Sequence, residues 1–293
     1  MQWDKDSQYL LVKHSYDKKS EWIVVRTDKT SSAVNITASL KTTVSSLRFA
    51  GNSGDAFYGL IGGAVRKINL KNNTVSSPLV SDVKEFSLYS DDIISYVTTS
   101  NKTTGIHSAG IVKDGQSPVL LEFSTDPKTV FHIEASHYFH NDYVAISNGS
   151  KTTIYRGEFP SSQTERSKLK ATRSFNIDGT VDWLRFSAKG RFIVAQHADT
   201  YRSLDLDRGA LSPKITLAGK TKATKLQWLD SYMVWSDRSK QLMIEEFDGA
   251  NRSVIGSVTP GFDVTLSPNG KYLYSIGATK KGFELQRIQM ILN

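Results

Sequence analysis

A short unit recurs seven times along this chain, and its spacing restricts the possible folds more than any other feature. Each copy has a strand-like segment, a tight turn and a second strand led by an aromatic residue; the clearest copy is Leu266-Ser-Pro-Asn-Gly-Lys-Tyr-Leu-Tyr. The copies are anchored at Trp3, Phe49, Leu88, Ala135, Phe186, Trp228 and Leu266. The anchors are on average about 44 residues apart, which is the period of a four-stranded propeller blade. The spacing therefore predicts an all-β, seven-bladed β-propeller with four-stranded blades.

The two positions before each anchor provide an independent check. Two residues before the anchor, every copy has an apolar residue: Met1, Leu47, Phe86, Ile133, Leu184, Leu226 and Val264. One residue before it, every copy has a polar residue: Gln2, Arg48, Ser87, Glu134, Arg185, Gln227 and Thr265. This period-2 alternation indicates a strand with one packed and one hydrated face. Because the first strand of each blade lines the central channel of a propeller, we predict that the polar set lines the channel. These seven polar residues need no further role, because hydrating the channel and cross-linking the blades would explain why they are polar.

The seventh copy is shorter than the others. Strands are expected at 264–267, 271–277 and 283–292, and the sequence then ends without a fourth. An open sheet edge exposes unpaired backbone groups, and propellers commonly close the ring with a strand from the other terminus. We therefore predict a last blade that is incomplete at the C-terminus. We also expect residues upstream of Met1 in the natural protein to supply the missing strand, and to carry an anchor or a further domain.

Composition narrows the class of protein. With 293 residues, 39% of them hydrophobic and 23% charged, the chain can bury a core and is too apolar to be disordered. It has no cysteine, which excludes disulfides and cysteine-bound metals. Its apolar runs stop after about four residues, whereas a membrane span needs roughly 20. We expect residues 1–293 to form one propeller domain without membrane contact of its own.

The repeat motif resembles that of a known group of propellers. Leu266-Ser-Pro-Asn-Gly-Lys-Tyr-Leu-Tyr is similar to the hydrophobic-Ser-Pro-Asp/Asn-Gly-Lys-aromatic-Leu repeat of TolB-like and WD-repeat-like bacterial propellers, and Phe186-Ser-Ala-Lys-Gly-Arg-Phe-Ile is a degenerate second match. As a whole, the chain resembles the propellers that follow a membrane anchor and a PEGA domain in bacterial surface proteins. The resemblance implies a binding or scaffolding role at the cell surface, with anchoring by an upstream segment, and it supplies no catalytic motif.

A second polar set lies three residues before some of the anchors. These residues are candidates for one mouth of the channel: Glu85, His132, Lys225 and Asp263. Propeller hydrolases and lactonases hold a divalent cation or an acid/base pair at such a mouth. Only Glu85 and Asp263 offer acidic ligands, and they belong to the third and seventh copies. We therefore predict no metal, no cofactor and no catalytic residue, and retain a channel-mouth hydrolase or lactonase as the alternative.

The other candidates for metal binding or catalysis are the histidine residues and nucleophile motifs. His132, His137 and His140 are close in sequence, but strand parity directs His137 away from His132, and residues 137–142 are expected to form a turn. We therefore interpret them as turn and surface histidines. The sequence has no Gly-x-Ser-x-Gly elbow, no P-loop and no Gly-x-Gly-x-x-Gly motif.

Charge suggests the kind of partner. The chain has 37 Lys and Arg against 29 Asp and Glu, for a net charge of +8, which favours anionic surfaces and polymers. The densest basic stretch, 166–173, is expected to be a solvated edge strand and not a specific nucleic-acid contact. We predict a non-catalytic interaction platform that binds a protein or an anionic surface polymer. Its specificity would come from loops carrying Tyr138, Phe139, Arg191 and Tyr232.

Overall fold

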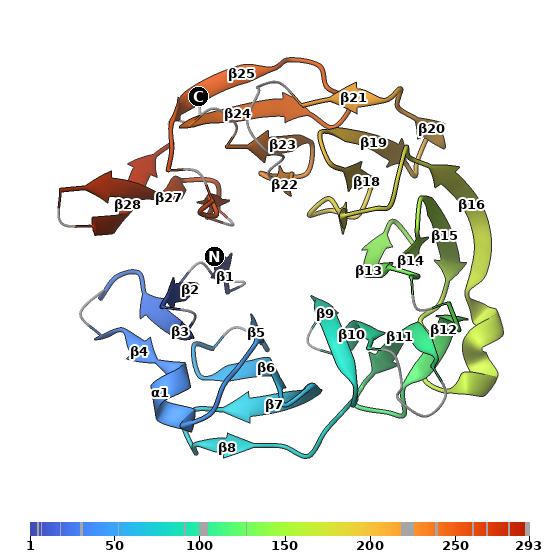
Figure 1. The fold of residues 1–293 in the computed structure, drawn as a ribbon, viewed down its shortest axis with the longest axis horizontal. Helices are drawn as coiled ribbons and strands as arrows, with labels where there is room; N and C mark the ends of the chain where they lie inside the picture. The colour runs from blue at the N-terminus through green and yellow to red at the C-terminus, as the bar shows by residue number, and fades with distance from the viewer. Residues whose placement is uncertain are drawn as a thin grey trace.

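The protein forms a ring of antiparallel sheets. The computed structural model describes residues 1–293 except 5, 7, 18, 30–31, 52, 91, 100–104, 127, 218–225, 238–239, 260, 268, 281 and 291–293. The described residues form seven separate sheets that follow one another around a common axis (Figure 1). The predicted all-β, seven-bladed propeller is confirmed.

Within each blade the strands follow chain order from the axis outward (Figure 1). Blade 1 has β1 (Gln2–Trp3), β2 (Tyr9–Tyr16), β3 (Lys19–Arg26) and β4 (Val34–Asn35); blade 2 has β5 (Ser46–Phe49), β6 (Ala56–Ile61), β7 (Ala64–Asn69) and β8 (Thr74–Val75). Blade 3 has β9 (Val83–Ser90), β10 (Ile93–Thr98), β11 (His107–Lys113) and β12 (Val119–Ser124); blade 4 has β13 (Phe131–Tyr138), β14 (Asn141–Asn148), β15 (Lys151–Gly157) and β16 (Lys170–Asn176). Blade 5 has β17 (Trp183–Phe186), β18 (Phe192–His197), β19 (Thr200–Asp205), β20 (Ala210–Leu211) and β21 (Ile215–Thr216); blade 6 has β22 (Gln227–Trp228), β23 (Met233–Ser236), β24 (Gln241–Glu246) and β25 (Ser253–Ser257).

Blades 5 and 7 depart from the four-stranded plan. In blade 5, β20 and β21 both pair with β19, at opposite ends of that strand, so two short strands share the outer position. Blade 7 has three strands among the described residues: β26 (Thr265–Leu266), β27 (Tyr272–Thr279) and β28 (Gly282–Gln289). The prediction that the last blade is incomplete is therefore confirmed.

Two short helical segments were not anticipated. Helix α1 (Ile36–Leu40) follows β4, and its N-cap Asn35 accepts a hydrogen bond from the Ala38 amide at 3.0 Å. The 3₁₀ helix η2 (Gln163–Lys168) lies between β15 and β16. The prediction that 166–173 is an edge strand was wrong for its first part, because η2 occupies that part and β16 begins at Lys170. A helix of five or six residues is too short to show a 3.6-residue periodicity.

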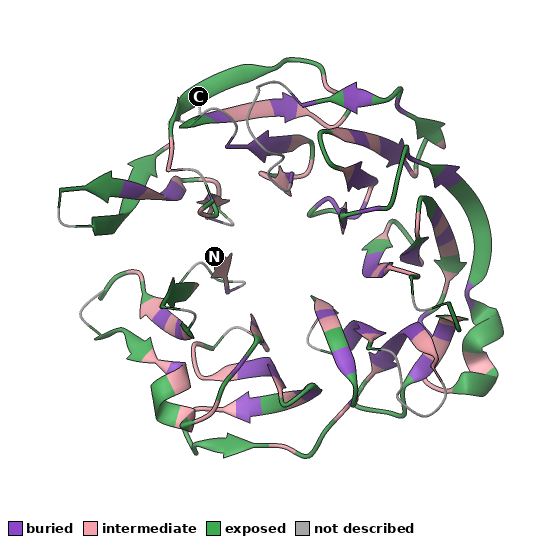
Figure 2. Ribbon diagram, in the orientation of Figure 1, coloured by how far each residue is buried: buried purple, intermediate pink, exposed green. Residues whose placement is uncertain are grey.

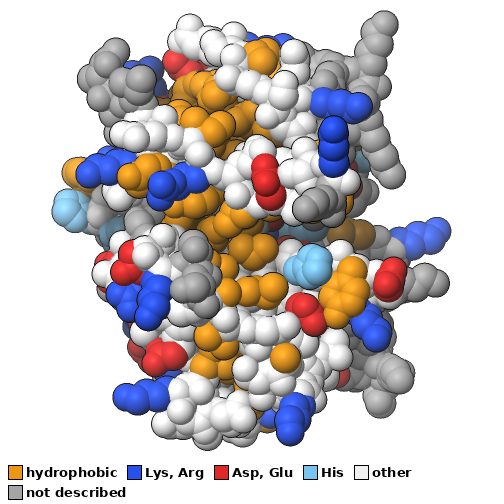
Figure 3. Space-filling view, turned by 90° about the vertical axis from the view of Figure 1, so that its left-hand side faces the viewer, with side chains coloured by type: hydrophobic (Ala, Val, Ile, Leu, Met, Phe, Trp, Pro, Cys, Tyr) orange, Lys and Arg blue, Asp and Glu red, His pale blue; other side chains and the backbone are white. Residues whose placement is uncertain are grey.

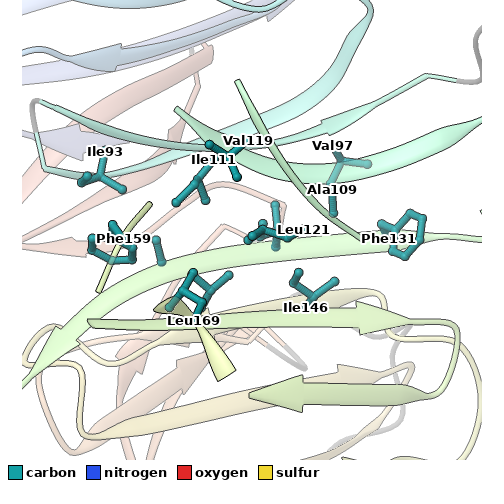
Figure 4. Packing of buried hydrophobic residues seen from close by; sticks show 13 residues of the cluster. Ile93, Val97, Ala109, Ile111, Val119, Leu121, Phe131, Ile146, Phe159 and Leu169 are labelled. Atoms are coloured by element: carbon teal, nitrogen blue, oxygen red, sulfur yellow. The ribbon is translucent and has the colours of Figure 1, made fainter. Parts of the chain in front are cut away.

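Hydrophobic cores lie between the blades. Six clusters of buried side chains fill the junctions from blades 1 and 2 through to blades 6 and 7. Buried residues concentrate in the inner strands, and exposed residues on the outer strands such as β8, β16 and β25 (Figure 2). Figure 4 shows the cluster between blades 3 and 4, where Ile111 and Val119 meet Ile146 and Leu169. Among the described residues no equivalent cluster joins blade 7 to blade 1. No helix within the described ranges has the length and apolar character of a membrane span.

Gly110 allows a test of the packing within blade 3. A Cβ built on Gly110 would lie 2.3 Å from the carbonyl oxygen of Val119 and 2.5 Å from the hydroxyl of Tyr96. Neither group can move away without shifting the sheet, so Gly110→Ala should lower the free energy of unfolding by about 1–3 kcal/mol. The measurement is urea unfolding followed by fluorescence. Gly256 in β25 is the matched control, because a Cβ there meets nothing within 4 Å. Gly256→Ala should stay within about 0.5 kcal/mol of wild type, and equal losses in the two variants would contradict the packing.

Candidate functional site

The polar residues before each anchor all lie on innermost strands. Their positions are Gln2 on β1, Arg48 on β5, Ser87 on β9, Glu134 on β13, Arg185 on β17, Gln227 on β22 and Thr265 on β26. Each innermost strand is paired on one side only, to the second strand of its blade. The alternating residues Leu47 and Phe49 on β5 are buried against neighbouring blades, whereas Arg48 is half-buried.

Arg185 is the centre of an ion-pair network that joins three blades. Its guanidinium donates to a carboxylate oxygen of Glu134, and its second amino group lies 3.7 Å from Oε1 of Glu85. The other oxygen of Glu85 lies 3.6 Å from Nδ1 of His132. Blades 3, 4 and 5 each contribute a charged group, and Arg185 also donates to the carbonyl of Leu184 at 3.0 Å.

Burial controls the electrostatics of this network. It raises the pKa of Glu134, and the Arg185 guanidinium opposes that rise. Burial also lowers the pKa of Arg48, as does the like charge of Arg185, while the carboxylates of Glu134, Glu85 and Asp263 act in the opposite direction. A carboxylate removed from water needs a positive partner to stay ionised. The guanidinium of Arg185 therefore serves as that partner for Glu134.

The four residues predicted for the mouth of the channel do not form one group. Glu85 and His132 are brought together, as described above. Asp263, whose side chain is 60% exposed, instead accepts from the N-terminal ammonium of Met1 at 2.6 Å, which links blade 7 to blade 1. Lys225 lies outside the described residues. Across the described part of the chain, no three His, Asp or Glu side chains are grouped so as to hold a metal ion.

The three histidines have different partners. His132 faces Glu85, while His137 contacts Asp142 through Nδ1 at 2.9 Å and the carbonyl of Phe139 through Nε2 at 2.8 Å. His140 lies in the turn after β13. The expected turn over 137–142 was too long, because the strands continue to Tyr138 and resume at Asn141. The turn therefore comprises Phe139 and His140 alone.

The His137–Asp142 pair should give this turn a pH dependence. The hydrogen bond with Asp142 raises the pKa of His137, and the Phe139 carbonyl acts in the same direction while burial opposes both. Because the folded-state pKa is raised, the stabilisation is complete below the ordinary histidine pKa and is lost as pH rises through the folded-state value. An NMR titration of His137 should show the raised pKa, and Asp142→Asn should lower it. Asp178→Asn, at a carboxylate that pairs with Lys214, is the control. A His137 titration that Asp142→Asn leaves unchanged would contradict the assignment.

Aromatic residues and an arginine gather at the turns between first and second strands. Phe139 is in the β13–β14 turn, Arg191 directly precedes β18 and Tyr232 directly precedes β23. In a blade whose strands alternate in direction, these turns lie on one face of the ring. Phe139 is 76% exposed and Tyr232 is 50% exposed. The inner turns of blades 4, 5 and 6 therefore present large side chains on one face.

Contacts within blades 4 and 5, and between blades 5 and 6, connect these residues. The Tyr138 and Phe139 rings lie 6.5 Å apart. The guanidinium of Arg191 lies 5.0 Å from the ring centre of Phe192, and the Phe192 ring lies 5.5 Å from that of Tyr232. We call Tyr138, Phe139, Arg191, Tyr232 and Phe247 the aromatic–arginine strip; Phe247 joins it by stacking on Phe192 at 3.9 Å. Sequence reasoning missed Phe247, because it lies after the third strand of blade 6 and far from the repeat anchors.

Arg191 is held rigidly within the strip. Its Nε and a terminal nitrogen donate to the two carboxylate oxygens of Asp205 at 3.1 and 2.8 Å, and Asp207 lies 3.6 Å away. Burial would raise the pKa of Asp205, but these hydrogen bonds from Arg191 and those from the Arg208 and Asp207 amides outweigh it and lower the pKa. A bidentate pair keeps the guanidinium in one orientation. The strip is therefore preorganised at its centre.

Comparisons with known proteins show likeness in fold. No protein-family model and no curated protein sequence matches the chain. Solved structures do: a chain of a mitotic checkpoint complex has a TM-score of 0.62 and 13% identity, with 98% of this chain and 86% of that chain covered. Hsv2 of Kluyveromyces lactis has a TM-score of 0.58 and 14% identity, with 98% and 96% covered. An oligogalacturonate lyase from Vibrio parahaemolyticus has a TM-score of 0.56 and 10% identity, with 98% and 88% covered. The similar structures thus include both a member of a complex and an enzyme, and at these identities the likeness establishes the seven-bladed propeller fold.

Proposed function

We propose that this propeller is a non-catalytic interaction platform that binds a protein partner through the aromatic–arginine strip. The observation that carries the proposal is the strip itself, which places Phe139 and Tyr232 on either side of an arginine oriented by Asp205. Aromatic residues and arginine dominate the binding energy of protein interfaces. Rigid side chains also lose little entropy on binding.

The channel mouth supports the same choice. The carboxylates of Glu85 and Glu134 both lie against Arg185, so the acidic groups there already take part in an ion-pair network between blades. Propeller hydrolases need converging acidic or amide ligands that are open to a metal or substrate. In this proposal, the network holds blades 3, 4 and 5 together.

Location and charge complete the proposal. We propose, from the resemblance of the repeats to propellers of PEGA-domain proteins, that the platform acts at a bacterial cell surface and is anchored by an upstream segment; cell fractionation tests this. The net charge of +8 would attract an anionic partner from a distance. Exposed charges are screened beyond about 8 Å at physiological ionic strength, so salt should slow association and leave the strip contacts in place. Binding to an anionic surface polymer alone would instead disappear with salt.

Site-specific photo-crosslinking tests the strip. Benzoylphenylalanine is incorporated in place of Phe139, in the cells that express the protein, and the crosslinked partner is identified by mass spectrometry. The affinity of that purified partner is then measured by calorimetry. Phe139→Ala and Tyr232→Ala should each weaken binding by about tenfold or more.

The control residue is Phe123, which is 62% exposed on the outer strand β12 and lies outside the strip. Phe123→Ala should leave the affinity unchanged, and so should Glu85→Gln. Equal losses for Phe123 and Phe139 would refute the strip as the binding surface. Hydrolysis of a lactone or ester that disappears in Glu85→Gln would show that the mouth is an active site.

A further inference from the structure

A basic cleft lies at the junction of blades 4 and 5, next to the aromatic–arginine strip. It has a volume of about 170 Å³ and is lined by Tyr143, Arg156, Thr172, Arg173 and Leu206. The first four belong to β14, β15 and β16 of blade 4, and Leu206 directly follows β19 of blade 5. We call this hollow the arginine cleft, because two arginine side chains border it.

Strand register aligns the arginine cleft with the strip. Tyr143 pairs with Arg156, and Ile154, two residues before Arg156, pairs with Arg173. Paired residues, and residues two apart on one strand, direct their side chains to the same side of a sheet. Tyr138 packs against the same buried cluster as Tyr143 and Ile154. A row of side chains on the blade 5 side of blade 4 therefore runs outward from Tyr138 of the strip to the two arginines.

The inner wall of the cleft is apolar, and blade 5 positions one of its arginines. Tyr143 is only 7% exposed, and Leu206 packs against the cluster between blades 4 and 5. The guanidinium of Arg173 donates to the carbonyl of Gly209 at 3.2 Å, and a Cβ on Gly209 would overlap this guanidinium. A guanidinium has five N–H donors, so Arg173 keeps others for a ligand. Charges also interact more strongly beside a wall that excludes water.

The basic groups of this region have no acidic partners. Among the described residues, neither Arg156 nor Lys170 makes a hydrogen bond or ion pair with its side chain, and the two are directly opposite each other in the sheet. Glu158 contacts a lysine of η2 at 3.7 Å, and the carboxylates on either side of Leu206 contact Arg191. Like charges directly opposite each other destabilise a sheet. The arrangement therefore favours an anionic ligand, which would neutralise these charges.

Basic side chains on another side of the ring are arranged differently. Where blades 7 and 1 meet, hydrophobic side chains form a run down the middle, and Lys and Arg side chains lie around it (Figure 3). On blade 1 the Lys13 ammonium lies 5.5 Å from the Trp22 ring, and on blade 7 the Arg287 guanidinium lies 4.7 Å from the Tyr272 ring. Each of these two cations lies over an aromatic ring, and they border different clefts. The convergence of two arginines on one hollow is thus a local feature of blade 4.

We propose that the arginine cleft binds a phosphate group on a side chain of the protein partner; that this partner also occupies the strip rests on the proposed function. A phosphorylated side chain carries a charge of about −1.5 to −2 at pH 7 and has three acceptor oxygens. It therefore balances two guanidinium groups, whereas a carboxylate balances one. Guanidinium groups also bind phosphate oxygens through pairs of parallel hydrogen bonds.

The distance from the strip to the cleft favours one extended peptide as the carrier of the phosphate. Neighbouring strands lie about 4.8 Å apart, so the path from β13, which carries Tyr138, to the space between β15 and β16 is about 12 Å. An extended chain covers about 3.3 Å per residue. An apolar residue on the strip and a phosphorylated residue in the cleft are therefore expected about four positions apart in the partner.

An NMR titration of the intact protein tests the cleft by itself. The probe is the amide of N-acetyl-O-phosphoserine, which has a phosphate group and no apolar side chain for the strip. We expect saturable shifts of the backbone amides of 156 and 171–173. The α-amide of N-acetylglutamate is the matched carboxylate probe and should bind at least about tenfold more weakly. Phe139→Ala should leave binding of the phosphoserine probe unchanged.

Variants locate the phosphate group. Arg156→Gln and Arg173→Gln should each weaken binding of the phosphoserine probe by about tenfold, because each removes charge-assisted hydrogen bonds. Arg156→Lys should retain part of the affinity, since lysine keeps the charge without the planar fork. The matched control is Arg66→Gln on blade 2, because Arg66 also donates to a backbone carbonyl, that of Ser76 at 2.8 Å, and does not border the cleft. Arg156→Gln should not lower the free energy of unfolding, because it removes no contact among the described residues.

The partner identified by crosslinking from Phe139 tests the rest of the proposal. Phosphatase treatment of this partner and Arg156→Gln in the propeller should each weaken the complex by about tenfold. The two changes together should weaken it little further, because both remove the same interaction. If the phosphoserine probe binds the cleft but Phe139→Ala leaves the complex intact, the strip is rejected and the cleft is retained.

Three results would overturn the proposal. The first is the absence of saturable shifts at 156 and 171–173 with the phosphoserine probe. The second is equal affinity for the glutamate probe, which would assign the cleft to a carboxylate. The third is binding to phosphatidylcholine vesicles containing phosphatidylinositol 4-phosphate that Arg156→Gln abolishes, together with a protein complex that phosphatase leaves unchanged. The phosphate would then belong to a lipid headgroup.

Discussion

Arg185→Ala should lower the free energy of unfolding by about 3 kcal/mol, measured by urea unfolding at neutral pH. The substitution leaves Glu134 on β13 without the guanidinium that supports its charge, and the Glu134 side chain is only 10% exposed. Arg48 also acts to lower the pKa of Glu134, but Arg48 is itself removed from water, and this burial lowers its own pKa. Most of the lost free energy of unfolding is the cost of leaving the Glu134 carboxylate buried without a positive partner. The net stabilisation by the ion pair itself is the smaller part.

Two further measurements separate these contributions. In the double variant with Arg185→Met and Glu134→Gln, no buried charge lacks a partner, so most of the stability should return.

Burial raises the pKa of Glu134 and Arg185 counteracts that rise, so removing Arg185 raises the pKa further. A raised folded-state pKa means that stability increases as pH falls through that value. The deficit of Arg185→Ala should therefore shrink in acid, and a deficit that is constant with pH would contradict this account.

Trp235→Ala should cost about 3–5 kcal/mol and should act first on blade 7. Trp235 is 2% exposed on β23 and packs with Val264 and Leu273 of blade 7. This cluster is the one hydrophobic core that holds blade 7 within the described residues, because no equivalent joins blade 7 to blade 1. Hydrogen exchange in β27 should therefore accelerate well before exchange in β14 changes.

Phe86→Ala provides the comparison. Phe86 is also 2% exposed but lies at the junction of blades 2 and 3, and each of these blades has a core on both faces. Its loss should be similar in size but spread across the ring, without selective opening of β27. If Trp235→Ala and Phe86→Ala gave the same exchange pattern, blade 7 would be as firmly held as the other blades.

The architecture followed from the sequence because its signals are local and repeated. A strand reveals its packed face through alternation over a few residues, and seven copies in one register leave little freedom in blade number. Leu47 and Phe49 on either side of Arg48 already indicate which face of β5 is buried. The short helices α1 and η2 were not predicted because five or six residues are too few to show a helical periodicity. Helix α1 is instead held by a local contact, the hydrogen bond from the Ala38 amide to Asn35.

Only the tertiary structure decided how the polar residues pair. Glu134 and Arg185 are 51 residues apart, and they meet because consecutive blades bring their innermost strands side by side. Alternation places each side chain on a face but does not specify its neighbour across the blade junction. The same holds for the aromatic–arginine strip, in which Arg191 was recognisable but its support by Asp205 was not. The junction of blades 7 and 1 is likewise decided by the tertiary structure: whether these two blades share a core depends on how the ring closes, which the spacing of the repeats does not encode.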